Sequence, residues 1–303
     1  MLTLKAYAKI NLTLEVLGRR DDGYHEVATI MQTVDLHDTV SLTPAADITL
    51  SCDDPALESP DNLAHKAAQL LQDESGYNGG AHIAIEKAIP VSAGLGGGSS
   101  DAAATLRGLN DLWQLNMSTA QLQTLAAKLG SDVPFLLQGG TAIALGRGER
   151  VRHLPPADIQ WMVVLTPDVS HTGAVAGGAV ESKTAALYGK LTPGNYTRGF
   201  LTRKLEARIR GGHDLPAQFL FNAFDDVAFD GYPGIEQCWN TFTELGAREI
   251  HLSGSGPSMY ALMPRREVGT AIHLLLRHKH GMNAHLVQAI QPDQVSPLPG
   301  GEG

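Results

Sequence analysis

The sequence has little of what secreted and membrane proteins depend on. It contains two cysteines among 303 residues, Cys52 and Cys238. They lie far apart and show no metal-binding spacing, so we expect reduced thiols. The longest interior apolar run is Trp161–Leu165, whereas a membrane-spanning helix needs about 20 residues. The first ten residues lack the order of a signal peptide. We therefore expect a cytoplasmic protein with no membrane partner.

Positive charge is also scarce. The chain has 23 Lys and Arg against 32 Asp and Glu, a net charge of -9 with histidine neutral. An acidic protein repels a phosphate backbone, and no basic stripe occurs in the sequence. We therefore expect no nucleic-acid partner. With 43% hydrophobic and 18% charged residues, the composition is that of a globular protein rather than a disordered one.

Length and pattern predict two domains of the α+β class. At roughly 150 residues per domain, a chain of 303 residues suggests two, and the composition changes near Pro155. We place an N-terminal domain at residues 1–154, a C-terminal domain at 155–291 and a flexible, Pro- and Gly-rich tail at 292–303. Strand and helix patterns follow one another irregularly, which favours α+β over a doubly wound sheet.

Periodicity and capping signals predict the individual elements. The expected strands are residues 2–6, 12–16, a run from Val27, 40–42, 48–50, 82–86, 141–145, 161–165, 249–252, 258–262 and 284–287. The expected helices are one capped by Asn62, then 102–112, one capped by Ser118 that reaches Leu129, then 179–187, 197–210, 235–245 and 268–276. Residues 90–100 are expected to have no regular structure.

A glycine-rich segment between a strand and a helix gives the strongest functional signal. Residues 90–101 read Pro-Val-Ser-Ala-Gly-Leu-Gly-Gly-Gly-Ser-Ser-Asp. Its glycines let backbone N–H groups converge on one point, and the positive end of the following helix faces the same point. The Walker lysine motif is absent, and Ser99 takes the third-glycine position of the dinucleotide motif. The pattern predicts a phosphate-binding loop, with a flexible linker as the alternative.

This segment resembles the central motif of the GHMP kinase superfamily. Residues 6–12 (Ala-Tyr-Ala-Lys-Ile-Asn-Leu) and 252–258 (Leu-Ser-Gly-Ser-Gly-Pro-Ser) resemble its first and third motifs. The resemblance covers nearly the whole chain and implies a two-domain α+β fold with the active site in the cleft between the domains. It also implies ATP as phosphoryl donor. The residues implied to bind ATP and its phosphates are Pro90, Ser92, Ala93, Gly94, Leu95, Gly96, Gly97, Gly98, Ser99 and Ser100.

Two further segments narrow the resemblance to one branch of the superfamily. Residues 18–25 (Gly-Arg-Arg-Asp-Asp-Gly-Tyr-His) and 130–135 (Gly-Ser-Asp-Val-Pro-Phe), followed by Gly-Arg-Gly-Glu at 146–149, are similar to kinases of a cytidine-diphosphate-linked methylerythritol. The resemblance implies phosphorylation of the 2-hydroxyl of that substrate in the non-mevalonate isoprenoid pathway. A superfamily kinase for mevalonate, homoserine or a sugar is the alternative, and a catalytically silent nucleotide-binding protein is a third hypothesis.

Lys9 and Asp132 match the charged residues that the superfamily uses in catalysis. The resemblance implies that Asp132 accepts the proton of the acceptor hydroxyl. Lys9 would orient that hydroxyl, keep Asp132 ionised and stabilise charge on the γ-phosphate. Both residues also have structural interpretations. Asp132 would cap a helix that begins at Val133, and Lys9 would be a solvated strand residue.

Further residues are candidates for binding the acceptor. Asn11 follows Lys9 by two positions and so shares its face of a strand, where it would bind the tetritol or a phosphate. Tyr24 and His25 offer an aromatic face and ring nitrogens to a pyrimidine. The alternative is a tyrosine that packs on a turn beside a solvated histidine.

The resemblance also implies a threonine and, four residues later, an aromatic residue near the cytosine. Thr184 and Tyr188 have this spacing and would share one face of a helix. They come later than the family pattern, after an extended stretch at 167–182.

The third motif would bring backbone donors to the phosphates of the substrate. The residues concerned are Gly254, Ser255 and Gly256, and an ordinary β-turn is the alternative. No acidic Mg²⁺ ligand is evident from the spacing, so we expect Mg²⁺ to be held mainly by ATP phosphates, with Ser99 or Ser100 as a protein ligand. We expect a small-molecule substrate and a monomer or homodimer.

Overall fold

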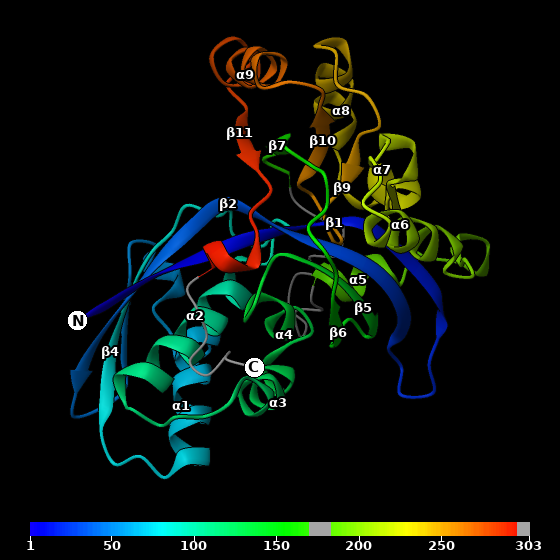
Figure 1. Ribbon diagram of the computed structural model, residues 1–303. Coiled ribbons are helices and arrows are strands. Elements are labelled where there is room, and N and C mark those ends of the chain that lie inside the picture. The colour runs from blue at the N-terminus through cyan, green and yellow to red at the C-terminus, as the bar shows by residue number, and fades with distance from the viewer. Residues whose placement is uncertain (170–182, 296–303) are drawn as a thin grey trace, which may run out of the picture.

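The computed structural model describes residues 1–169 and 183–295, and two β-sheets form its framework (Figure 1). The strands of the first sheet are β1 (Leu2–Arg19), β2 (His25–Ala45), β3 (Thr49–Cys52), β4 (Gly80–Glu86), β5 (Thr141–Gly146), β6 (Arg150–His153) and β8 (Phe221–Asn222). The strands of the second sheet are β7 (Trp161–Thr166), β9 (His251–Leu252), β10 (Met259–Met263) and β11 (Asn283–Gln288). Together with the helices, they confirm the predicted α+β class.

A hairpin of two long strands, β1 and β2, organises the first sheet. One end of β2 also pairs with β4 and the other end pairs with β5, both antiparallel. Residues 40–42 are therefore part of β2, and residues 2–6 and 12–16 belong to the single strand β1. The prediction of separate short strands is wrong because backbone pairing continues through the irregularities between Tyr7 and Lys9 and between Asn11 and Thr13.

The helices of the N-terminal half cover one face of this sheet (Figure 1). They are α1 (Leu63–Ser75), α2 (Gly97–Leu112), α3 (Thr119–Leu129) and α4 (Val133–Leu136). Both predicted caps are confirmed. The Asn62 side chain accepts a hydrogen bond from the backbone N–H of Ala64 at 2.9 Å, and Ser118 forms a capping box with Gln121.

The second sheet has the antiparallel order β11-β7-β10-β9, and its two faces pack in different directions. Val163 and Leu165 of β7 share a core with Ile272 of α9 (Arg266–Leu274), and α8 (Ile235–Glu244) also contributes to that core. Met162 and Val164 face the opposite way and pack with apolar residues of β1 and β2. The second sheet is therefore held between its own helices and the first sheet (Figure 1).

The second half of the chain also returns to the first sheet. Helix α6 (Phe200–Arg210) contributes Leu205 and Ile209 to the core that β1 and β2 line. Strand β8 pairs in parallel with β1, with Phe221 opposite Thr13. The two remaining described helices are α5 (Lys183–Tyr188) and α7 (Ala228–Gly231); residues 179–182 of the helix expected at 179–187 lie outside the described residues. The domain boundary near Pro155 stays a prediction.

The segment expected to be a flexible tail begins as packed structure. Residues Pro292–Gln294 form a 3-10 helix, and Val295 is buried. A Cβ at Gly140 would lie 2.4 Å from the Pro292 ring, so the segment lies directly against the chain before β5. Its packing partner is about half the chain away, which the local Pro and Gly content does not reveal. Residues 296–303 of the predicted tail lie outside the described residues.

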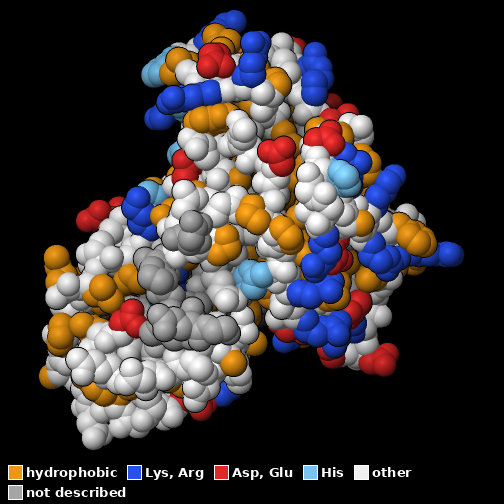
Figure 2. Space-filling view, in the orientation of Figure 1, with side chains coloured by type: hydrophobic (Ala, Val, Ile, Leu, Met, Phe, Trp, Pro, Cys, Tyr) orange, Lys and Arg blue, Asp and Glu red, His pale blue; other side chains and the backbone are white. Residues whose placement is uncertain are grey.

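Basic side chains gather at two places on the visible face, over α9 and along the flank formed by α6 (Figure 2). On α6 many of these charges are paired. Glu206 binds both Arg152 and Arg210, at 2.7 and 2.8 Å, and Arg208 binds Asp214. In the part of the chain that the structure describes, no helix has the length and apolar character needed to cross a membrane.

Candidate active site

The predicted phosphate-binding segment forms a loop that leads from β4 into α2. Gly94 and Gly96 have φ angles of 85° and 73°, a backbone conformation that favours glycine. Gly94 also has no room for a side chain, because a Cβ there would meet the carbonyl oxygen of Ser253 at 2.1 Å. The loop between β4 and α2 therefore packs directly against the third glycine motif.

Helix α2 begins at Gly97, five residues earlier than predicted. The expectation of irregular structure throughout residues 90–100 is wrong for the last four of them. No side chain caps the helix, and its first N–H groups have no partners within an α-helix. Such a helix start favours an anion, which explains why glycines and serines stand here instead of strong helix formers.

The residues implied to bind ATP occupy different environments. Gly94, Gly96 and Ser99 line a cavity of about 870 Å³. Ser92 and Ala93 line a second cavity, of about 880 Å³, which is described below. The Leu95 side chain is buried in the core, and the remaining members, Pro90, Gly97, Gly98 and Ser100, belong to the same loop and the first turn of α2.

A buried ion cluster anchors the start of this loop. Lys87 Nζ lies 2.5 Å from Asp38 Oδ2 and 2.8 Å from Asp101 Oδ2. Asp38 Oδ1 also accepts hydrogen bonds from the backbone N–H groups of Ala88 and Ile89. Burial raises the pKa of Asp101 to about 7, since it outweighs the attraction of the Lys87 ammonium. The cluster fixes the loop to β2 at one end and to α2 at the other.

Lys9 and Asp132 form a charged pair inside the 870 Å³ cavity. Lys9 is 3% exposed, and its Nζ lies 3.3 Å from Asp132 Oδ2. It also donates a 2.8 Å hydrogen bond to Asn11 Oδ1. Lys9 is therefore not a solvated strand residue. Asp132 stands at the start of α4 without a side-chain capping bond, so the helix-capping interpretation of its side chain is also wrong.

Tyr24 and His25 lie at the aromatic end of the same cavity. The His25 ring stacks on Tyr188, with centroids 4.7 Å apart and planes inclined by 20°. Tyr196 adds its hydroxyl 3.4 Å from His25 Nε2. Burial lowers the pKa of His25 and so favours the neutral ring. Tyr24 is 57% exposed and carries the Arg147 guanidinium 4.8 Å from its ring centroid.

Helix α5 brings Thr184 and Tyr188 to the cavity from the second half of the chain. Thr184 Oγ1 lies 3.3 Å from Ser255 Oγ, so the helix is adjacent to the third glycine motif. Burial and the negative charge of Asp132 raise the pKa of Tyr188. The two residues therefore lie together in the cavity, and their contact with the cytosine stays a prediction. Residues 170–182 of the extended stretch before them lie outside the described residues.

Two backbone amides of the third motif are bonded within the protein. The N–H of Gly254 donates to Asn11 Oδ1 at 2.8 Å. The N–H of Gly256 donates to the Ser253 carbonyl at 2.9 Å and closes a β-turn. Both amides have protein acceptors in this structure, and the binding of substrate phosphates by this motif stays a prediction. Gly254 and Ser255 do line the cavity, whereas Gly256 does not.

The cavity is also lined by residues that the sequence did not indicate as site residues. Arg147 lies within the Gly-Arg-Gly-Glu segment that supported the resemblance, so its signal was present in the sequence. Arg19 directly precedes the turn between β1 and β2. Tyr196 and Phe224 come from distant parts of the chain, where no local pattern marks them. The ring centroids of Phe224 and Tyr188 lie 4.9 Å apart, with the ring planes inclined by 87°.

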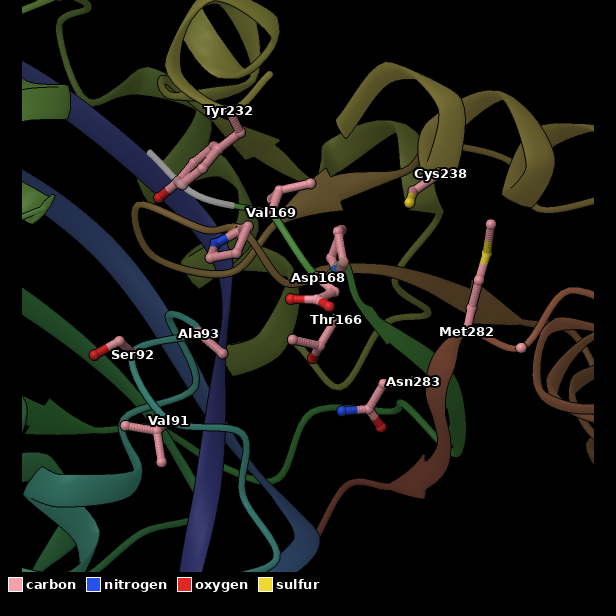
Figure 3. A pocket seen from close by; sticks show the side chains of 13 residues that line it. Val91, Ser92, Ala93, Thr166, Asp168, Val169, Tyr232, Cys238, Met282 and Asn283 are labelled. Carbon is pink, nitrogen blue, oxygen red and sulfur yellow. The ribbon is translucent and has the colours of Figure 1, made fainter. Parts of the chain in front are cut away.

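The glycine loop also borders a second cavity, of about 880 Å³ (Figure 3). Val91 and Ser92 line one side of it and Asn283 lines the opposite side (Figure 3). Among the described residues that line it, Asp168 carries the only charge. Ser92 and Ala93, which the resemblance implies to bind ATP, line this cavity, and that assignment stays a prediction.

The fold and the site define the class of GHMP kinases: a glycine loop opens into a helix beside a lysine–aspartate pair. The family model for the GHMP kinases N terminal domain matches residues 62–140. Over 292 residues the chain is 41% identical to the 4-diphosphocytidyl-2-C-methyl-D-erythritol kinase of Dehalococcoides mccartyi, covering 96% of this chain and 99% of that one. The chain belongs to the 4-diphosphocytidyl-2-C-methyl-D-erythritol kinase family.

Solved structures agree with this assignment. A crystal structure of 4-(cytidine 5'-diphospho)-2C-methyl-D-erythritol kinase superposes with a TM-score of 0.77 at 31% identity, covering 95% of this chain and 100% of that chain. The mevalonate kinase of Methanococcus jannaschii superposes with a TM-score of 0.66 at 14% identity, covering 96% and 98%. The second likeness shows a shared fold alone.

Proposed function

We propose that this protein transfers the γ-phosphoryl group of ATP to the 2-hydroxyl of 4-diphosphocytidyl-2-C-methyl-D-erythritol, in the synthesis of isoprenoid precursors by the non-mevalonate pathway. One observation carries the proposal: the Lys9–Asp132 pair shares a cavity with the glycine loop and with the aromatic cluster around His25. The acceptor has a hydroxyl, a diphosphate and a pyrimidine, and the cavity offers suitable groups for each. A protein that uses ATP in this way is expected in the cytoplasm, where ATP is available.

The charged pair suits phosphoryl transfer to a hydroxyl. The Asp132 carboxylate accepts the hydroxyl proton while the oxygen forms a bond to the γ-phosphorus. The bond from that phosphorus to the β,γ-bridging oxygen breaks, and ADP leaves with the electron pair. The Lys9 ammonium lies 3.3 Å from Asp132 Oδ2, where it orients the carboxylate and stabilises charge on the γ-phosphoryl group.

The aromatic end suits the cytidylyl part of the acceptor. Tyr24 and Tyr188 offer ring faces for stacking on a pyrimidine, and the neutral His25 ring has both a donor and an acceptor for the base edge. Arg19 and Arg147 place positive charge in the same cavity as these rings. We propose that these two arginines bind the negatively charged diphosphate of the acceptor, because guanidinium groups bind phosphate oxygens well.

The hydroxyl groups of the loop fit a Mg²⁺ ion held mainly by ATP phosphates. Ser99 lines the cavity, whereas the buried Ser100 hydroxyl donates to the Tyr7 carbonyl at 2.7 Å. Ser99 is therefore the hydroxyl that would hold Mg²⁺. Among the described residues, no cluster of His, Cys, Asp and Glu could hold the ion by itself. When bound, Mg²⁺ would neutralise phosphate charge.

The test is ADP release by the purified protein with ATP, Mg²⁺ and 4-diphosphocytidyl-2-C-methyl-D-erythritol. We expect release that depends on this acceptor and that is absent with mevalonate or homoserine. Product analysis by ³¹P NMR would show a new phosphomonoester on the tetritol and an intact diphosphate. Release with mevalonate or homoserine instead would replace this proposal with another kinase of the superfamily. ATP binding without release on any of these acceptors would indicate a silent nucleotide-binding protein.

A further inference from the structure

We propose that Thr29 is a positioning residue for Lys9 and acts through the side-chain amide of Asn11. Thr29 lies on β2 and also lines the cavity. No sequence motif drew attention to it. The inference rests on the proposed function, because it concerns how the same charged pair is held for reaction.

The Asn11 amide connects three parts of the site. Its Oδ1 accepts hydrogen bonds from Lys9 Nζ and from the Gly254 N–H, both at 2.8 Å. Its Nδ2 donates to Thr29 Oγ1, also at 2.8 Å. Asn11 is 2% exposed, so water does not readily replace these partners. A carboxamide with two donors at its oxygen and an acceptor at its nitrogen has one favourable orientation.

The role of Thr29 as acceptor is fixed by its own hydrogen bond. Its hydroxyl donates to the Thr13 carbonyl at 2.6 Å. A hydroxyl has a single proton, so Thr29 Oγ1 can only accept from Asn11. The two hydrogen bonds therefore run in one direction. Asn11 donates to Thr29, and Thr29 donates to the backbone of β1.

The structure around Thr29 is rigid as well as buried. Thr13 Oγ1 lies 3.0 Å from Thr202 Oγ1, which donates to it, and the Thr202 N–H donates to Glu15 Oε2 at 2.7 Å. Thr13, Thr29, Thr202 and Glu15 are all buried. The network ties the two long strands to the start of α6. Thr29 thus links this scaffold to the side chains of Asn11 and Lys9.

Loss of the Thr29 hydroxyl would remove the acceptor that helps to orient the Asn11 side-chain amide. Asn11 Nδ2 would become a buried donor without its acceptor. Reorientation of the amide to bring Nδ2 to a new acceptor would move Oδ1 away from the Lys9 ammonium and the Gly254 N–H. Lys9 Nζ would then lose its hydrogen bond to Asn11 and keep the ion pair with Asp132. The ammonium would no longer be held at the place where charge develops.

The test compares wild type with Thr29→Val, Thr29→Ser and a matched control, Thr141→Val. Valine has the shape of threonine without the hydroxyl, and serine keeps the hydroxyl. Thr141 is also a buried strand threonine bonded to a side-chain amide, with Oγ1 donating to Gln32 Oε1 at 2.6 Å. It does not line the cavity. Thermal unfolding of each variant measures the cost to the fold alone.

We expect Thr29→Val to lower kcat about 10- to 100-fold, because small displacements of reacting groups have effects of this size. The KM for ATP should change less than about twofold, because uniform binding is retained. Thr29→Ser should restore most of kcat, and Thr141→Val should leave it near wild type. Equal kcat values for Thr29→Val and Thr141→Val would overturn the inference. Failure of serine to restore kcat would overturn it too, because packing would then be the cause.

Crystal structures of wild type and Thr29→Val give a readout that does not need activity. We expect the variant to lose the contact between Lys9 Nζ and Asn11 Oδ1 while the backbone of β1 and β2 stays in place. An unchanged contact would overturn the inference. A wild-type protein that turns over no acceptor would instead refute the proposed function, and the two crystal structures would still decide the role of Thr29.

Discussion

Two cavities of nearly equal volume, about 870 and 880 Å³, border one glycine loop. The first contains Lys9 and Asp132 together with two arginines and a cluster of aromatic rings. The second is lined by small, apolar and neutral polar side chains, with Asp168 as its only charge among the described residues (Figure 3). Volume and proximity to the loop therefore do not distinguish them.

The difference lies in how the polar groups are held. In the first cavity Lys9 and Asn11 are almost fully buried, and each has hydrogen-bond or ion-pair partners that fix its position. In the second cavity Asp168 and Asn283 are exposed. Buried polar groups are costly unless they are satisfied, so a buried lysine paired with a partly exposed aspartate indicates function more strongly than an open cleft does.

The largest expected effect comes from Asp132→Asn in the first cavity. The amide cannot accept the hydroxyl proton as a carboxylate does, so kcat should fall by about 10²- to 10⁴-fold, the usual contribution of a general base. ATP binding should change little. Steady-state ADP release and calorimetric titration with a non-hydrolysable ATP analogue measure the two quantities.

Asp61→Asn is the control for Asp132→Asn, because Asp61 also pairs with a lysine, Lys66 at 2.9 Å, but on the surface. It should leave kcat within about twofold of wild type, as is usual for surface substitutions. Turnover of Asp132→Asn at the wild-type rate would remove Asp132 from the mechanism and with it the main distinction between the cavities.

A smaller effect is expected at the aromatic end. Tyr24→Leu and Tyr188→Leu each remove a ring face, and base–aromatic stacking contributes about 1–3 kcal/mol. The KM for the cytidylyl acceptor should rise roughly 5- to 150-fold by that measure, with the KM for ATP unchanged. Initial-rate kinetics with each substrate varied in turn would measure the KM for the acceptor and the KM for ATP separately.

The matched control for these variants is Tyr77→Leu. Tyr77 stacks on Trp113, with centroids 4.6 Å apart and planes at 17°, away from both cavities. We expect it to lower stability without moving either KM. Equal effects of Tyr77→Leu and Tyr188→Leu on the acceptor KM would mean that the ring at 188 supports the fold rather than the base.

The sequence predicted those parts of the site that depend on local pattern. Asn62 and Ser118 were identifiable as caps because the capping partner lies within three residues. Lys9, Asp132 and the glycine loop were identifiable because each stands in a segment that resembles a motif. Their meeting in one cavity required the resemblance, since no spacing relates Lys9 to Asp132.

The features that the sequence did not predict depend on contacts between residues that are far apart in the chain. The start of α2 at Gly97 contradicts the low helix propensity of glycine, because packing of the loop outweighs it; a Cβ at Gly96, for example, would lie 3.0 Å from the Lys9 side chain. The N–H of Gly254 is held by Asn11, far away in sequence. The role of Thr29 depends on the register of β1 against β2, which brings its hydroxyl to Asn11. Such contacts follow from the fold and have no signature in the local sequence.

The smallest effect is expected in the second cavity, from Asp168→Asn. The exposed carboxylate is the only charge in the described lining, so a ligand bound there by charge would depend on it. We expect kcat and both KM values to stay within about twofold of wild type, as for other surface positions. Initial rates with ATP and the acceptor varied separately would measure this. A tenfold change in the KM for ATP would show that the nucleotide passes under the loop at Ser92. The two cavities would then be the halves of one substrate site, and the loop would be a bridge across it rather than a boundary.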